Sequence, residues 1–307
     1  MDARAGAARI SVISNTALVF GKLAVGISIN SVSVISEAGH SGIDLVAAVI
    51  AYFSIRLASR PADVEHRYGH GKIENISGVI EALLIFMAAV WIIIEAAKKI
   101  ISGAPVTATG AGILVMAFSG IINFFVSRHL YRVAKATDSI ALEADALHLR
   151  TDVYTSLGVM LGLIALELTG LHWLDPVIAL VVAATIVLAA YKLTREAFLP
   201  LIDARLPEAE EKTITSIIAN YGSEYVEFHK LRTRKAGRER QVDLHLVVPG
   251  NRHVDEVHEL CDRIVSDIKT ALPHTQVLIH VEPCQSDEDC RICSNCYRQE
   301  SDDRKSN

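Results

Sequence analysis

The chain has 307 residues, of which 51% are hydrophobic and only 6% are aromatic, and its mean hydropathy is +0.33. This composition is more apolar than that of a typical soluble domain and favours a membrane protein. The formal net charge of −5 argues against a nucleic-acid-binding protein, which normally carries a basic surface. Charged residues crowd into the last third of the chain, so we expect a membrane domain over residues 1–206 followed by a soluble domain.

Six apolar segments are each long enough to cross a bilayer as a helix, which takes about 20 residues. The first is too long for a signal peptide and lacks a cleavage site, so a transmembrane helix is expected there. Lys and Arg gather on one side of the alternating segments, which predicts a multi-pass membrane protein with both termini in the cytoplasm. The membrane that we expect is the inner (cytoplasmic) one. The predicted spans are residues 9–29, 32–58, 75–101, 107–131, 139–169 and 174–194.

Residues 207–283 predict a small soluble domain of the α+β class. Apolar residues alternate with polar ones from Val242 to Val248, as expected of a strand with one buried face. The predicted elements, in the order α-β-β-α-β, are residues 208–220, 225–234, 240–248, 253–270 and 277–281.

The second and fifth predicted spans each carry a histidine and an aspartate; such ionisable residues are costly in lipid and usually face the interior of a helix bundle. The second span has His40 and Asp44, and the fifth has His148 and Asp152. Each pair is spaced i, i+4, which places both side chains on one helix face. If the four side chains converge, they would form the kind of tetrahedral site that zinc prefers. The alternative is that the buried His and Asp side chains simply hydrogen-bond each other across the helices. The occurrence of the same spacing on two spans favours a metal site.

Three further carboxylates near these pairs, Glu37, Glu143 and Asp145, are expected to be interfacial or to lie outside the ligand set. A histidine binds metal only when its imidazole is neutral, so metal binding releases protons and protonation expels the metal. Ligands of this kind predict an exchanger of metal ions against protons.

Two more groups of candidate ligands lie outside the spans. Asp63, His66 and His70 lie in the loop after the second span. The alternative to a metal site there is a solvated cytoplasmic loop. The soluble domain carries five candidates on separate elements, and their spacing does not decide whether they meet. They are His229, His245, His258, His280 and Glu282.

The polar tail, residues 284–307, contains four cysteines in the pattern C-x5-C-x2-C-x2-C. Cytoplasmic thiols stay reduced, so metal binding is favoured over disulfides, either by zinc or by an iron–sulfur cluster. The alternative is an unpacked tail with incidental thiols. We expect a metal-capturing or regulatory site formed by Cys284, Cys290, Cys293 and Cys296.

Apart from the cysteine tail, to which the resemblance gives no role, these motifs resemble the cation diffusion facilitator family of metal–proton antiporters. The resemblance covers about residue 8 to Pro283 and depends on the two intramembrane His-x3-Asp pairs and on the Asp-x2-His-x3-His-Gly-Lys loop. It implies six transmembrane helices, a metallochaperone-like cytoplasmic domain, a homodimer and alternating access. Two departures stand out: His40 lies where bacterial relatives often have a carboxylate, and Glu282 where they often have Asp.

The resemblance also implies roles for single residues. The transported ion would bind His40, Asp44, His148 and Asp152, and a loop ion would bind Asp63, His66 and His70. Two ions at the dimer interface would bind His229, His245, His258, His280 and Glu282. Lys72 and Asp203 match the positions of an inter-helix salt bridge.

The leading interpretation is therefore a secondary transporter that exports Zn²⁺, with Fe²⁺, Cd²⁺ and Co²⁺ as other candidate ions. A membrane metal sensor is the alternative, but a sensor has no need of ligands inside the membrane. A redox protein built around the cysteine tail is a second rival. The sequence shows no nucleophile motif and no nucleotide-binding glycine-rich loop, so an enzyme is not expected.

Overall fold

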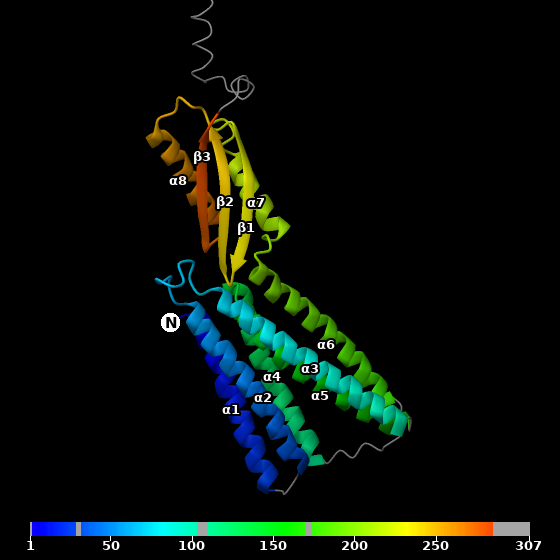
Figure 1. The fold of residues 1–307 in the computed structure, drawn as a ribbon. Coiled ribbons are helices and arrows are strands. Elements are labelled where there is room, and N and C mark those ends of the chain that lie inside the picture. Colours follow the sequence, from blue (N-terminus) through cyan, green and yellow to red (C-terminus); the bar gives the residue numbers. More distant parts are fainter. Residues whose placement is uncertain (1, 29–31, 103–109, 170–173, 285–307) are drawn as a thin grey trace, which may run out of the picture. The chain divides into compact units, whose positions relative to one another are not determined.

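The computed structural model describes residues 2–28, 32–102, 110–169 and 174–284 (Figure 1). The chain divides into two compact units, Met1–Leu201 and Ile202–Asn307, and each is described by itself below.

The first unit consists of long helices, one for each predicted span. Most helix ends lie close to the ends of the predicted spans, and some helices continue a few residues beyond them. The helices are α1 (Ala3–Ser28), α2 (Val32–Ala58), α3 (Lys72–Ser102), α4 (Gly110–Thr137), α5 (Ile140–Thr169) and α6 (Leu174–Phe198), followed by a short 3-10 turn at Leu199–Ile202.

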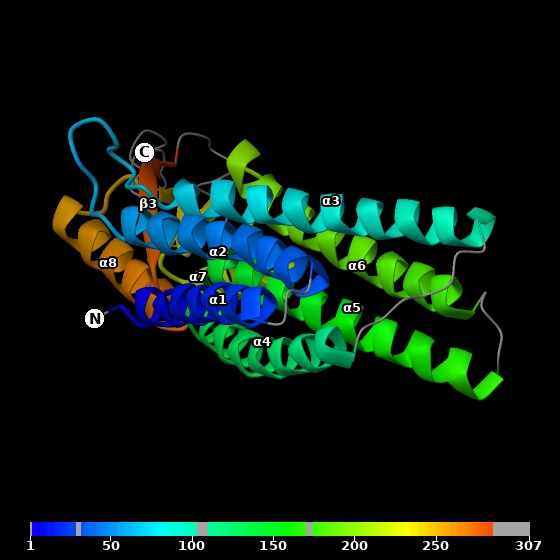
Figure 2. The same cartoon turned by 90° about the horizontal axis from the view of Figure 1, so that it is seen from below.

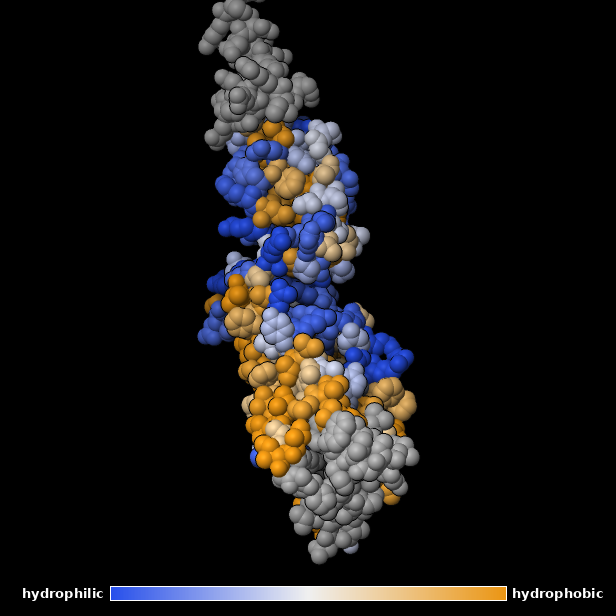
Figure 3. All heavy atoms as spheres, turned by 90° about the vertical axis from the view of Figure 1, so that its right-hand side faces the viewer, coloured by the Kyte–Doolittle hydropathy of each residue, from blue (hydrophilic) through white to orange (hydrophobic). Residues whose placement is uncertain are grey.

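Large apolar side chains cover much of the outside of this helical unit, as a lipid environment requires. Figure 3 shows such side chains gathered over one face of the unit. Within the described residues, four stretches are long and apolar enough to cross a membrane by themselves. These are Ala3–Ser28, Ala38–Ala58, Lys72–Lys98 and Val177–Ile202.

The helices of the first unit pack in neighbouring pairs. Helix α1 lies beside α2, α3 beside α6, and α4 beside α5, as Figures 1 and 2 both show. Helix α5 also contacts α2, α3 and α6, so it is central to the bundle. Gly158 permits a close approach of α5 to α6, because a Cβ there would lie 2.8 Å from Cγ2 of Val182. This central place brings the ionisable residues of α5 among those of α2 and α3.

The second unit is the predicted α+β domain. A three-stranded sheet has the order β1-β2-β3, with β1 and β2 antiparallel and β2 and β3 parallel. Gly237, with a φ of 59°, forms the turn between β1 and β2. The elements are α7 (Glu208–Ala219), β1 (Glu227–Ala236), β2 (Glu239–Val248), α8 (Val254–Ala271) and β3 (Thr275–Pro283).

One face of this sheet is buried under the two helices. Leu244 and Leu246 of β2 share a core with Ile218 of α7 and with Leu260 and Ile264 of α8. Because side chains alternate along a strand, the residues between them, such as His245, face the other side of the sheet. The domain therefore has an apolar face toward its helices and a polar face that carries histidines.

Candidate metal centres

The four intramembrane candidates come together between α2 and α5. Nε2 of His148 lies 3.0 Å from Oδ1 of Asp44, and Nε2 of His40 lies 3.6 Å from Oδ1 of Asp152. His40, Asp44 and Asp152 each offer a ligand atom within 4.8 Å of the other two. Each close contact joins a residue of α2 to a residue of α5, so the helix interface forms the site.

The site is buried on one side and exposed on the other. The side chains of Asp44 and His148 are 4% and 8% exposed, whereas that of His40 is 52% exposed. The carboxylates of Asp44 and Asp152 offer ligand atoms within 4.8 Å of each other, and two carboxylates this close repel each other unless a cation or protons lie between them. The arrangement can therefore hold a divalent cation or, in its place, protons.

Asn123 of α4 is a site residue that the sequence-based reasoning missed. Its Nδ2 donates a hydrogen bond of 3.4 Å to Oδ2 of Asp152, while its Oδ1 is buried without a partner among the described residues. The available signal was an amide in the middle of an apolar span, where polar groups usually have a function. We infer that Asn123 orients Asp152 toward the site.

The loop candidates also converge. Oδ1 of Asp63 accepts hydrogen bonds from the backbone N–H of His66 at 2.6 Å and of Glu65 at 3.0 Å, which fixes the carboxylate. Its two oxygens lie 3.3 Å from Nδ1 of His66 and 3.4 Å from Nε2 of His70. The N–H of His66, with smaller contributions from the two imidazoles, lowers the pKa of Asp63 below its ordinary value. Three ligand atoms thus meet in this loop, and Glu65 contributes only its backbone.

A third cluster lies on the polar face of the sheet in the second unit. His229 is opposite His245, and His245 is beside His280, because β2 pairs with both neighbouring strands at this level. Oε1 of Glu282 lies 2.7 Å from Nδ1 of His245, and Oε2 lies 3.3 Å from Nε2 of His229. Nε2 of His280 is 3.7 Å from Oε1. The hydrogen bond with His245 is the main cause that lowers the pKa of Glu282.

Strand β1 is irregular next to this cluster. The register shifts between His229 and Arg232, and Lys230 has a φ of 52°, which a non-glycine residue rarely adopts. Such bulges re-aim side chains near functional sites. The longer side chain of Glu282, noted above as a departure, spans the distance to both His229 and His245.

His258 lies apart from this cluster in the single chain. It is exposed on α8, and its Nε2 is 3.5 Å from Oδ2 of Asp262. Its role as a ligand at a dimer interface stays a prediction. The same holds for the Lys72–Asp203 salt bridge, whose residues fall in different units.

The cysteine tail is described only at its start. Cys284 is buried, and its backbone N–H donates to the carbonyl oxygen of Val248 at 3.0 Å. The other three cysteines, Cys290, Cys293 and Cys296, lie outside the described residues, so the tail site stays a prediction.

The three flanking carboxylates differ from one another. Glu143 forms an ion pair of 2.6 Å with Lys135 at the start of α5, in agreement with an interfacial place. Asp145 is only 1% exposed, so its side chain lies inside the helix bundle. The side chain of Glu37 lies outside the described part.

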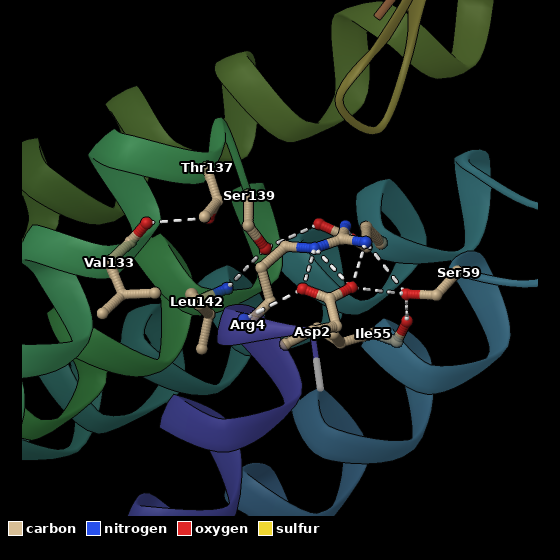
Figure 4. A network of polar contacts seen from close by, with 9 residues as sticks. Asp2, Arg4, Ile55, Ser59, Val133, Thr137, Ser139 and Leu142 are labelled. Carbon is tan, nitrogen blue, oxygen red and sulfur yellow. Dashed lines mark hydrogen bonds and ion pairs between the residues drawn. The ribbon is translucent and has the colours of Figure 1, made fainter.

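A buried polar network at one end of the helical unit is a second feature that the sequence did not reveal (Figure 4). The guanidinium of Arg4 on α1 pairs with Asp2 and with the buried Glu74 of α3. Ser139, just before α5, donates a hydrogen bond of 2.7 Å to Oε2 of Glu74, and Ser59 joins Arg4 and Asp2. This network ties α1, α3 and α5 together.

Each of the two units matches a known protein domain family. Residues 8–202 match the model of the cation efflux transmembrane domain, and residues 206–284 match that of the cation efflux protein cytoplasmic domain. An uncharacterized transporter of Synechocystis is 37% identical over 83% of this chain and 82% of its own length. The cation-efflux pump FieF of Shewanella oneidensis is 30% identical over 91% of this chain and 94% of its own.

One solved structure, from work on CzrB, a proposed zinc transporter, is 37% identical and covers 26% of this chain and 99% of that chain, with a TM-score of 0.25. The matched models cover both units, and the relatives cover most of the chain. The chain therefore belongs to the cation efflux family of multi-pass membrane transporters, with a helical transmembrane domain and a small cytoplasmic α+β domain that contains three strands.

Proposed function

We propose that the protein exports zinc from the cytoplasm in exchange for protons, by alternating access around His40, Asp44, His148 and Asp152. The observation that carries this proposal is the meeting of the two pairs across α2 and α5, with contacts of 3.0 and 3.6 Å. Family membership supports divalent-metal efflux and a transporter rather than an enzyme.

The donor set supports zinc as the ion. Two imidazoles and two carboxylates match its preference for four mixed nitrogen and oxygen ligands, whereas carboxylate-rich sites suit manganese better. Fe²⁺, Cd²⁺ and Co²⁺ can occupy such ligands and compete with zinc. We treat zinc as the transported substrate, and further zinc ions as structural or regulatory ions.

The ligands themselves supply the coupling to protons. His148 and Asp44 hydrogen-bond each other, and His40 lies close to Asp152, so each ligand has a partner. Zinc must replace these contacts and displace the protons they hold. Because α2 and α5 each supply half of the ligands, a change in the packing of these helices opens the site and releases the ion.

We further infer that the clusters outside the spans bind zinc. Asp63, His66 and His70 form the loop site, and His229, His245, His280 and Glu282 form the cytoplasmic site. The protein acts as a homodimer in which the cytoplasmic domains meet, and both termini are cytoplasmic. Zinc at the cytoplasmic site would then regulate transport.

The test is zinc flux into proteoliposomes under an imposed pH gradient. The parent protein is compared with Asp44→Asn and Asp152→Asn, and with Glu95→Gln, an exposed carboxylate on α3, as the matched control. The proposal is supported if zinc flux depends on the gradient and is abolished in Asp44→Asn and Asp152→Asn but not in Glu95→Gln. No flux of any ion, with zinc still tightly bound, would instead favour a membrane sensor.

A further inference from the structure

Two buried carboxylates in the membrane domain take no part in the zinc site. Glu81 of α3 is 0% exposed and Asp145 of α5 is 1% exposed. Among the described residues, none of their four carboxylate oxygens has a hydrogen-bond partner. An ionised carboxylate without a partner is strongly unfavourable inside a membrane protein, so it must bind a cation or a proton.

Glu81 and Asp145 lie together where α3 contacts α5. Their neighbours Ala82 and Ala144 belong to the same buried cluster, which joins the two helices. The two carboxyl groups are near enough to interact electrostatically. Two interacting carboxyl groups that are both buried do not both ionise, because the charges repel and neither is solvated.

The surroundings offer no fixed positive charge to this carboxyl pair. In the part of the chain that the structure describes, neither carboxylate forms an ion pair with Lys or Arg. Helix α6 faces α3 with apolar residues such as Ile186 and Leu193. The charged or titratable groups that interact electrostatically with Asp145 are Asp44 of α2 and His148 of α5. The hydroxyl group of Ser11 lies near Asp145, and that of Ser77 lies near Glu81.

Along the chain, Asp145 of α5 lies between Ser139, which belongs to the polar network, and the proposed zinc ligand His148. Asp145 precedes His148 by three residues on α5, which is less than one helical turn. Glu81 follows Glu74 by seven residues on α3, so both project from the same helix face about two turns apart. Glu74 is the acceptor for Ser139 and Arg4 in that network. Buried polar groups thus extend from the helix ends to the ion site.

We propose that Glu81 and Asp145 form a proton-binding site that relays protons between the zinc ligands and the Glu74 end of the helices. This inference rests on the proposed exchange of zinc against protons. When zinc displaces a proton from its ligands, one N–H or O–H bond breaks there and one O–H bond forms on the carboxyl pair. The pair then loses a proton to water through the polar network, so that no other reactant is needed.

Flux measurements test the relay. Zinc flux into proteoliposomes, with and without a pH gradient, is compared for the parent protein, Glu81→Gln, Asp145→Asn and the control Glu95→Gln. We expect the gradient to accelerate flux in the parent and the control, and this acceleration to be lost in Glu81→Gln and Asp145→Asn. Parent-like acceleration in both variants would overturn the relay while leaving zinc–proton exchange intact. A parent without gradient-driven flux would overturn the exchange itself, and the relay with it.

Infrared spectroscopy tests the site in the parent protein, which covers the case that a variant fails to fold. We expect a protonated-carboxyl band at neutral pH, where exposed carboxyl groups are ionised, and a shift of this band in D₂O. The band should persist in Glu95→Gln and decrease in folded Glu81→Gln or Asp145→Asn. A parent spectrum without such a band at neutral pH means that both groups are ionised, and this overturns the proposal.

Discussion

Nε2 of His148 and Oδ1 of Asp44 lie 3.0 Å apart although 104 residues separate them in the sequence. This contact joins the two helices that supply the proposed ion site, and it involves two of the four proposed ligands. Any ion that enters must compete with it, so the strength of this hydrogen bond contributes to affinity and to pH dependence.

Asn123 is the first residue to test around this site. Asn123→Ala removes the hydrogen bond to Asp152 and should weaken apparent zinc affinity by about tenfold, the lower end of the range for residues that orient metal ligands. Zinc titration of the purified protein, with flux in proteoliposomes, measures this. Ser119→Ala on the same helix is the control, since the Ser119 hydroxyl donates its hydrogen bond to the carbonyl oxygen of Val115 and not to a proposed ligand. Equal affinities for both variants would exclude the role of Asn123.

His40 should decide between zinc and harder ions. His40→Asp exchanges an imidazole nitrogen for a carboxylate oxygen, which suits manganese better than zinc. We expect the ratio of zinc flux to manganese flux to fall, because the site gains a carboxylate. The site should still bind an ion, because Asp44, His148 and Asp152 remain as ligands. Competition between the two ions in proteoliposomes gives the ratio directly. A ratio that stays at the parent value would show that selectivity is set elsewhere.

The Arg4–Glu74 pair should stabilise the helical unit. Glu74→Gln leaves the buried guanidinium of Arg4 with only Asp2 as its anionic partner, and we expect a loss of about 3 kcal/mol in the free energy of unfolding. Denaturant unfolding in detergent measures it. Glu196→Gln breaks an exposed pair with Lys192 and should cost less than about 0.5 kcal/mol. Similar losses in the two variants would contradict the structural role of the network.

Asp2 gives a pH dependence with a definite sign. Partial burial opposes the shift, but the hydrogen bonds from Arg4 and Ser59 lower the pKa of Asp2 from 3.8 to about 2. A lowered pKa stabilises the folded state above pH 3.8, and this stability is lost as the pH falls through about 2. Asp2→Asn should therefore cost about 1 kcal/mol, after allowance for solvent screening, and the loss should be constant from about pH 5 to 8.

Thermal unfolding of the parent and Asp2→Asn across this pH range checks the expectation. A difference that disappears already at pH 5 would mean that the carboxylate is not held by Arg4 and Ser59. Asp255→Asn, an exposed carboxylate on α8, is a suitable control.

The histidine cluster of the cytoplasmic domain should bind zinc through His245. His245→Ala removes the central imidazole, which contacts Glu282 at 2.7 Å and lies between His229 and His280. We expect the zinc content per chain to fall, because only His229, His280 and Glu282 of the four clustered ligands remain. His253→Ala, an exposed histidine before α8, is the control. Zinc content measured by elemental analysis that is unchanged in His245→Ala would count against a site here.

Much of the architecture can be read from local patterns. Six apolar segments predict the six long helices, and alternation predicts the strands of the soluble domain. The helix ends differ by several residues: α1 begins at Ala3 and α4 ends at Thr137, where the predicted spans begin at 9 and end at 131. The reason is that helices continue past the apolar stretch when polar side chains such as Arg4 find partners.

The sequence by itself also determined which ligands share a helix face, since the spacing i, i+4 is a local property of the helix. Only the tertiary structure decided what each face meets. Asn123 joins Asp152, and Glu81 lies by Asp145, because α4 and α3 pack against α5. Likewise, the histidines of β1, β2 and β3 align only through strand register. Packing and register arise from contacts between distant segments, which no local periodicity encodes.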